Sequence, residues 1–376
     1  MKESTVSKNQ LAREWDSSEI TLAARAAQRH VPLGGTFELT PRCNLNCRMC
    51  YVRLDTSEMK KIGRERTAKE WIALAREAAD EGTLNLLITG GEPLLREDFA
   101  EIYTAICQMG FIITLNTNAT LMNSEYLDLF KKYPPTATNV TLYGASAETY
   151  EKVCGSAAAF YKTIEGLEML SSIPTELEVR TTFIKDNVGE LDEVRRIANK
   201  YTKRFAINAF LNKAIRGASS EVENVRLSPR ELFDLYKDNA EYYNALNDPE
   251  EIALEKNMDT DNHIGVKDYG FDLPPKIITC LAAKSMYWIT WDGKMLPCGS
   301  FSSPYTLPFE EGFKKAWDRL PGLFEDIELP EKCKTCEFAD GKCSNCPAIL
   351  QSETGSFGTV SEYICAVALE RAGRKK

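Results

Sequence analysis

The segment Pro41-Arg-Cys-Asn-Leu-Asn-Cys-Arg-Met-Cys-Tyr51 follows directly on a strand-like stretch, residues 35–40, and carries three cysteines on one short loop. Cys43, Cys47 and Cys50 have the spacing C-x₃-C-x₂-C. Three thiolates on such a loop can bind three irons of a [4Fe–4S] cluster and leave the fourth iron open to another ligand. The alternatives are buried cysteines or a zinc site short of one ligand, although structural zinc sites normally have four. The spacing therefore favours an iron–sulfur loop.

Outward from this loop, the chain alternates between strand-like and helix-like segments. Strands are expected at residues 35–40, 84–89, 111–117, 139–143, 176–184 and 205–211, and helices at 67–81, 98–109, 124–132, 191–200 and 228–247, with further helical signal up to residue 170. Six successive β–α units imply a parallel sheet with right-handed crossovers. Because a closed barrel needs eight units, we predict an α/β fold with a partial (β/α)6 barrel, whose ligands gather at the carboxyl ends of the strands.

The chain is expected to have four parts. Residues 1–34 form an N-terminal helical segment, and residues 35–247 form the barrel. Residues 248–275 are polar and rich in Asp and Asn, as in a linker or lid. Residues 276–376 change to short strands, turns and cysteines and are predicted to form a second, cysteine-rich domain.

Composition limits the class of protein. Twelve cysteines accompany only two histidines, so any metal must be bound mostly by thiolates. A net charge of −9 argues against nucleic acid as a partner, because phosphate binding needs a basic surface. No apolar run of about 18 residues is present, which argues against a membrane span. The polar N-terminus has no signal-peptide pattern, and we therefore expect a cytoplasmic protein, in which structural disulfides are rare.

The C-x₃-C-x₂-C loop after a first strand resembles the signature of radical S-adenosylmethionine (radical SAM) enzymes. This resemblance implies that the open iron binds the amino and carboxylate groups of S-adenosylmethionine. An external electron donor, flavodoxin or ferredoxin, would then supply the electron that releases a 5′-deoxyadenosyl radical. Met49 stands where the family usually has an aromatic residue, which weakens only the expectation of adenine stacking.

A second motif ends the second strand, at Thr-Gly-Gly-Glu-Pro. By itself it could be a turn, since glycine permits positive φ and proline follows turns well. Beside the cysteine loop it resembles the family's "GGE" motif, which binds the amino group of S-adenosylmethionine. The resemblance implies cofactor contacts by Gly90, Gly91, Glu92 and Pro93.

Other strand ends offer further cofactor contacts. Asn116 and Asn118 end the third strand, Thr141 lies where the family usually has a residue that binds the ribose, and Arg180 could meet the cofactor carboxylate. Each could equally be an ordinary strand residue or part of a surface salt bridge.

The last hundred residues hold seven more cysteines. Cys333 to Cys346 have the spacing C-x₂-C-x₆-C-x₂-C, which alone is typical of a zinc ribbon. The additional residues Cys280, Cys298 and Cys365 are too many for one zinc ion. Cys107 is expected in the core, Cys154 has no assigned role, and neither histidine is expected to be a ligand.

The whole pattern resembles the SPASM extension of radical SAM enzymes, although that family usually has C-x₂-C-x₅-C-x₃-C. The resemblance implies two auxiliary [4Fe–4S] clusters, three clusters in all, and a hairpin over residues 290–298 that turns at Asp292-Gly293. The implied ligands are Cys280, Cys298 and Cys346 for the first auxiliary cluster, and Cys333, Cys336, Cys343 and Cys365 for the second.

SPASM proteins mostly modify peptides, so we expect an oxidoreductase that matures a ribosomally made precursor peptide by a thioether or carbon–carbon crosslink. Only 42 residues precede Cys43, and leader recognition is therefore assigned to the N-terminal helix or to a separate leader-binding protein. The alternatives are an anaerobic sulfatase maturase, against which Gly299 after Cys298 counts, and a small-molecule dehydrogenase. An electron carrier or a zinc-stabilised binding module is a further alternative, but neither would require the Gly-Gly-Glu-Pro motif. The catalytic base stays unassigned.

Overall fold

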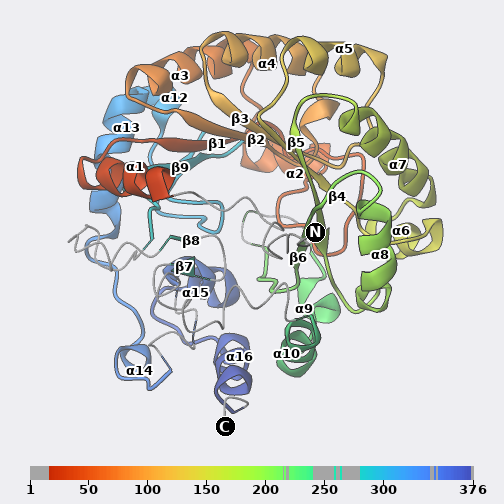
Figure 1. The fold of residues 1–376 in the computed structure, drawn as a ribbon. Helices are drawn as coiled ribbons and strands as arrows, with labels where there is room; N and C mark the ends of the chain where they lie inside the picture. The colour runs from red at the N-terminus through yellow and green to blue at the C-terminus, as the bar shows by residue number, and fades with distance from the viewer. Residues whose placement is uncertain are drawn as a thin grey trace, which may run out of the picture.

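The fold is a strongly curved sheet with helices along its outer side (Figure 1). The computed structural model describes residues 17–214, 216, 220–239, 258–259, 263–264, 280–338, 343 and 346–373. The strands of the main sheet run in the order β10-β9-β1-β2-β3-β4-β5-β6. Their bounds are β1 (Gly34–Glu38), β2 (Asn85–Thr89), β3 (Ile112–Thr117), β4 (Ala137–Thr141), β5 (Glu176–Thr182), β6 (Arg204–Asn208), β9 (Met286–Ile289) and β10 (Met295–Leu296). Neighbours from β1 to β6 pair in parallel, which confirms the predicted partial barrel.

The helices that follow the strands cover the convex side of the sheet, where α3, α4, α5 and α7 form an arc in Figure 1. The first ten are α1 (Ser17–Gln28), α2 (Thr56–Ile62), α3 (Ala68–Asp80), α4 (Phe99–Gln108), α5 (Ser124–Lys132), α6 (Ala147–Cys154), α7 (Ala157–Ser171), α8 (Leu191–Ala198), α9 (Val222–Val225) and α10 (Pro229–Asp238). The C-terminal part contributes α12 (Pro308–Glu311), α13 (Phe313–Arg319), α14 (Glu331–Lys334), α15 (Pro347–Thr354) and α16 (Glu362–Gly373). A separate antiparallel pair joins β7 (Met258–Asp259) and β8 (His263–Ile264).

The helix predicted from its capping box forms as expected. The Thr67 hydroxyl accepts from the Glu70 amide at 3.3 Å, and the Glu70 carboxylate accepts from the Thr67 amide at 2.8 Å. These bonds satisfy two amides that have no partner within the helix. Trp71 is fully buried on the inner face of α3, with its ring 4.9 Å from that of Phe37 in β1. The capping box thus sets where α3 begins, and the apolar face of α3 packs the helix against the sheet.

The C-terminal hairpin is part of the main sheet, which the sequence pattern did not indicate. β9 pairs in parallel with the edge of β1 that β2 leaves free, and β10 pairs antiparallel with β9. The expected turn is present: Gly293 has φ +94° and donates to the Thr290 carbonyl at 2.8 Å. The predicted boundary near residue 275, and most of the proposed lid, lie outside the described residues, as do residues 240–247 of the helix expected to follow β6.

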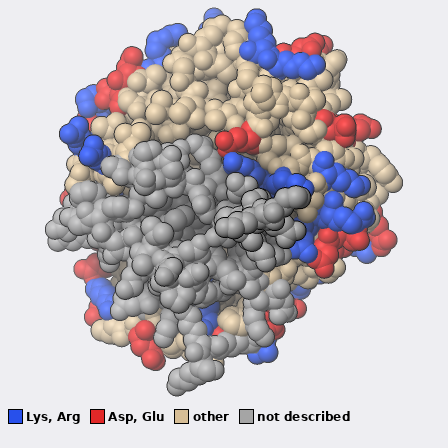
Figure 2. Space-filling view, in the orientation of Figure 1, with Lys and Arg blue, Asp and Glu red and all other residues tan. Residues whose placement is uncertain are grey.

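The visible surface mixes charges of both signs. Lys and Arg side chains lie beside Asp and Glu side chains around the rim of Figure 2. Within the part of the chain that the structure describes, no helix is long and apolar enough to cross a membrane.

A glycine on β1 permits the contact with β9 and yields the first prediction. A Cβ atom added at Gly35 would lie 2.3 Å from the Tyr287 ring, whereas one at Gly34 would make an ordinary 3.6 Å contact with Met286. We expect Gly35→Ala to lower the free energy of unfolding by about 1–3 kcal/mol, because a packed core does not accept the added volume. Gly34→Ala is the matched control and should change it little. Denaturant unfolding followed by circular dichroism measures both, and equal losses would contradict the account.

Candidate active site

The three cysteines of the first motif lie in the loop after β1, and we call Cys43, Cys47 and Cys50 the loop group. The loop is fastened at both ends: the Leu54 amide donates to the Pro41 carbonyl at 3.1 Å, and two loop amides donate to the end of α6. Burial raises the pKa of Cys43, and the nearby Glu92, Cys47 and Cys50 raise it further. The structure therefore brings the three thiols close enough for their charges to interact.

The C-terminal cysteines influence one another's pKa values within two sets, and their role as cluster ligands stays a prediction. Burial raises the pKa of Cys346, and Cys298 and Cys280 raise it further; these three are auxiliary group I. Burial raises the pKa of Cys343 to about 11, with contributions from the other members of its set. The members of auxiliary group II are Cys333, Cys336, Cys343 and Cys365.

The donor set of the loop group fits an iron–sulfur cluster. Its side chains are free thiols, the ligand type of [4Fe–4S] clusters. Across the described ranges, no three Cys, His, Asp or Glu side chains converge closely enough to hold a single metal ion.

The glycine pair at the end of β2 allows two backbones to approach closely. The Gly91 amide donates to the Thr40 carbonyl at 2.7 Å, and the Glu92 amide to the Arg42 carbonyl at 2.9 Å. A Cβ atom at Gly90 or Gly91 would lie within 2.5 Å of these same carbonyl oxygens. The motif therefore holds the entrance of the cysteine loop, a role that its sequence alone did not reveal. Pro93 begins a 3₁₀ turn (Pro93–Leu95) directly after it.

Glu92 fastens the end of β2 to the end of β3. Its side chain is fully buried, and its carboxylate accepts from the Thr117 hydroxyl at 2.8 Å, the Asn118 amide at 2.7 Å and the Leu94 amide at 3.1 Å. Burial raises the pKa of Glu92 to about 7, and these hydrogen bonds oppose the rise. Contact with a cofactor ammonium stays a prediction for this residue.

Of the other predicted contacts, Asn118 reaches the loop group. Its side-chain amide lies 3.7 Å from the Cys43 sulfur and donates to Asn44 Oδ1 at 3.0 Å. Asn116 accepts from Asn139 at 2.8 Å, within the sheet.

Two of the predicted contacts lie on neighbouring strands. Arg180 forms an ion pair with Glu178 of its own strand, and Thr141, its register partner at the end of β4, is half-buried. Their contacts with the cofactor stay predictions.

Sequence reasoning missed a buried charged cluster beside the loop group. Glu38, the last residue of β1, is 1% exposed, and its Oε2 accepts from Arg216 Nη2 at 2.6 Å and Trp288 Nε1 at 3.1 Å. Arg216 also donates to the Gly299 carbonyl, next to Cys298 of auxiliary group I. The sequence feature that could have revealed this cluster is a glutamate at the end of a largely apolar strand, with two residues between it and the Pro41–Tyr51 segment.

Two aromatic rings flank the guanidinium of this cluster. The Tyr51 ring centroid lies 5.4 Å from the Arg216 guanidinium, and that of Trp288 lies 5.6 Å from it. Burial raises the pKa of the Tyr51 hydroxyl, although 41% of the surface of the residue stays exposed. Because Tyr51 follows Cys50, and Arg216 opposes the rise in the pKa of Cys298, the Glu38–Arg216 cluster joins the loop group to auxiliary group I.

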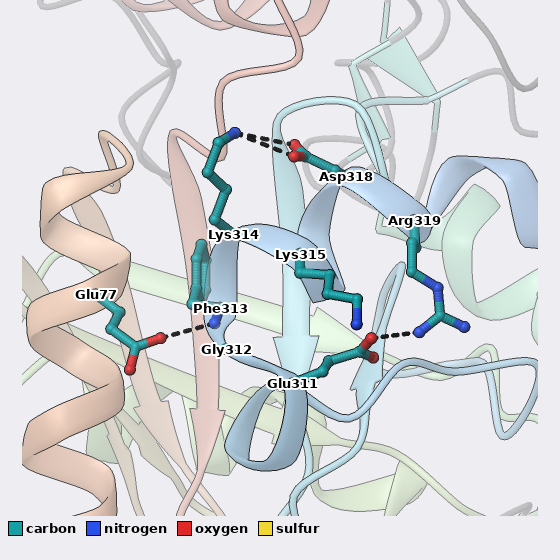
Figure 3. Close-up of a pocket in the computed structure, with 8 residues that line it drawn as sticks. All are labelled: Glu77, Glu311, Gly312, Phe313, Lys314, Lys315, Asp318 and Arg319. Carbon is teal, nitrogen blue, oxygen red and sulfur yellow. Dashed lines mark hydrogen bonds and ion pairs between the residues drawn. The ribbon is translucent and has the colours of Figure 1, made fainter.

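A hollow of about 480 Å³ elsewhere is a surface feature (Figure 3). It lies where α3 meets α12 and α13, and its charged groups are engaged: Glu77 accepts from the Phe313 amide at 2.7 Å, and Lys314 pairs with Asp318 at 3.0 Å. Its lining residues come from both the barrel and the C-terminal part, and none of them belongs to the Glu38–Arg216 cluster.

The buried Glu92 gives a pH prediction for the cluster-free protein. An unfolded glutamate has a pKa near 4.3, so folding takes up a proton between that pH and about 7. The free energy of unfolding should therefore fall as pH rises from 5 to 8, by on the order of 3 kcal/mol from this residue. Glu92→Gln should remove that part of the slope. Glu148→Gln is the control, because Lys152 holds the pKa of that exposed carboxylate below its usual range. Equal slopes in wild type and Glu92→Gln would contradict the assignment.

Comparison with known proteins gives several relatives. An AdoMet-dependent heme synthase of Methanosarcina barkeri is 26% identical over 93% of this chain and 99% of its own length. A PqqA peptide cyclase of Granulibacter bethesdensis is 22% identical over 90% of this chain and 88% of its own. The structure of Streptococcus suis SuiB bound to S-adenosylmethionine superposes with a TM-score of 0.66 at 18% identity, over 89% of this chain and 77% of SuiB, and therefore shares the fold.

The family model that matches is that of the radical SAM superfamily, over residues 37–198. This range begins in β1, ends with α8 and contains the loop group and the Gly90–Gly91 turn. Residues 37–198 therefore form a radical SAM domain, and the chain is an enzyme.

Proposed function

We propose that this enzyme matures a ribosomally made peptide by forming a thioether or carbon–carbon crosslink. The observation that carries the proposal is the position of auxiliary group I, three thiols that the Glu38–Arg216 cluster joins to the loop group. A substrate bound at this cluster would meet the radical chemistry on one side and a second metal centre on the other.

Different residues of the chain would hold the radical-generating site and the substrate. A [4Fe–4S] cluster and S-adenosylmethionine, which the superfamily implies, supply a 5′-deoxyadenosyl radical when bound at the loop group. Asn118 and the Gly90–Gly91 turn hold the cysteine loop in place. Glu38 holds Arg216 and Trp288 in place, and their side chains and Tyr51 would orient the substrate and exclude water.

The thiol count of auxiliary group I points to sulfur chemistry. Three cysteine ligands leave one iron of a [4Fe–4S] cluster without a protein thiolate. A substrate cysteine could bind there as its thiolate, which a metal ion stabilises by lowering the thiol pKa. If another side chain occupies that position, the cluster would only accept the electron, and a carbon–carbon link would form instead.

The relatives support a peptide substrate. One is named as a peptide cyclase, and SuiB has also been solved bound to its precursor peptide SuiA. We include in the proposal an external flavodoxin or ferredoxin as electron donor, leader binding by the N-terminal helix or a separate protein, and a cytoplasmic location. Sulfatase maturation is disfavoured, because a side chain at Gly299 would lie 2.7 Å from the Trp288 ring and has no room.

A second candidate is heme synthesis. It is favoured by the full-length similarity to three proteins named AdoMet-dependent heme synthase. The substrate would then be an iron-porphyrin precursor, whose carboxylate groups Arg216 could bind.

The first prediction of this proposal is the metal content of each cysteine group. Anaerobically reconstituted protein should hold about twelve irons per chain, four for each of three [4Fe–4S] clusters. Joint replacement of Cys333, Cys336 and Cys343 by Ala should remove about four of them, measured by iron and sulfide analysis. Stoichiometric zinc with four irons or fewer in the wild type would reject the two auxiliary clusters.

The second prediction is the product. The enzyme is incubated with S-adenosylmethionine, a reductant and the precursor peptide encoded beside its gene. A thioether should lower the peptide mass by two hydrogens and leave one cysteine fewer to react with iodoacetamide, measured by mass spectrometry. Two hydrogens lost with every cysteine still reactive would instead identify the carbon–carbon link.

A parallel reaction with the iron-porphyrin precursor separates the two candidate functions. An unchanged peptide together with a smaller porphyrin mass would reject peptide maturation in favour of heme synthesis. A variant with Cys43, Cys47 and Cys50 replaced by Ala is the blank for both reactions.

A further inference from the structure

The sulfur of Cys47 lies against two side chains that the mechanism has not used. Cys154, the last residue of α6, is fully buried and shares a hydrogen bond with Cys47. The Tyr143 hydroxyl donates a second hydrogen bond to the same sulfur. The Cys47 sulfur therefore has two side-chain hydrogen-bond partners, Cys154 and Tyr143.

The backbone fixes this arrangement. The Asn46 amide donates to the Cys154 carbonyl at 2.9 Å, and the Arg48 amide donates to the Val153 carbonyl at 3.0 Å. These carbonyls belong to the end of α6, which the helix itself leaves without partners. Because the bonds flank Cys47 on both sides, its sulfur is held beside the Cys154 thiol.

Tyr143 is held from the other side. Its amide donates to the Tyr150 hydroxyl at 3.2 Å, and its carbonyl accepts from the Asn187 side chain at 2.8 Å. The two rings meet edge to face, with centroids 6.1 Å apart. Tyr143, whose hydroxyl reaches Cys47, is thus held in place by Tyr150 and Asn187.

We propose that Cys154 and Tyr143 are positioning residues that donate hydrogen bonds to the Cys47 ligand and raise the reduction potential of the cluster bound at the loop group. A ligating Cys47 is a thiolate and has no proton to give, so the thiol of Cys154 must be the donor in their bond. Two donors draw negative charge from the ligand sulfur, and hydrogen bonds to cluster sulfurs are one of the factors that set the potential. The proposal rests on the loop group holding the cluster.

The test is the midpoint potential of the loop-group cluster, followed by electron paramagnetic resonance in a redox titration. Its signal is identified as the one that changes when S-adenosylmethionine is added. Cys154→Ala and Tyr143→Phe each remove one donor, and each should shift the midpoint to more negative values. At the wild-type midpoint, the ratio of reduced to oxidised cluster should fall about tenfold in each variant, equivalent to ~59 mV for one electron.

Two further variants separate this role from packing. Cys154→Ser keeps a donor and should restore a midpoint close to wild type. Cys107→Ala removes a partly buried cysteine from a different helix, α4, and should leave the midpoint unchanged. An unchanged midpoint in both Cys154→Ala and Tyr143→Phe, or the same shift in Cys107→Ala, would overturn the proposal.

Iron content distinguishes the failure of the premise from the failure of the proposal. A wild-type protein without a signal that responds to S-adenosylmethionine would show that the loop group holds no cluster. If Cys154→Ala alone fails to load iron, the midpoint potentials of Tyr143→Phe and Cys154→Ser test the proposal, because both substitutions keep the size of the side chain close to that of the wild type.

Discussion

The hydrogen bonding of β1 to two partners, β2 on one edge and β9 on the other, is the constraint on which the site depends. Gly34 is in register with Asn85 and also with Met286, far along the chain. The loop group follows β1, the Gly90–Gly91 turn ends β2, and auxiliary group I begins beside β9. Because β1 and β2 are parallel, the segments that follow them emerge at the same end of the sheet. Cys280 and Cys298 flank the β9–β10 hairpin, which the pairing of β9 with β1 brings to the other edge of β1.

Features that depend on residues close together in sequence could be predicted. The capping box of α3, the strands of the partial barrel and the turn at Gly293 follow from local patterns, and the structure confirms them. The division of the C-terminal cysteines into three and four came from a family resemblance; cysteines of each set influence one another's pKa values, and their use as cluster ligands stays a prediction.

Features that depend on distant contacts could not be predicted. β9 has four residues, and nothing in so short a segment indicates that its partner is β1. Glu38 gives no sign in the sequence that Arg216 and Trp288 will meet it, and Cys154 gives none that it will lie beside Cys47. Glu92 gives no sign in the sequence that its oxygens will accept hydrogen bonds from the end of β3, which only the assembled sheet brings near, and its contact with a cofactor stays a prediction.

The central claim is that the loop group alone cleaves S-adenosylmethionine, while the auxiliary groups serve the substrate. Formation of 5′-deoxyadenosine under reducing conditions tests it most directly. We compare a variant with Cys43, Cys47 and Cys50 replaced by Ala with one in which Cys280, Cys298 and Cys346 are replaced. The first should form none, and the second should still form it without modifying the substrate. Cleavage at the wild-type rate in the first variant would contradict the account.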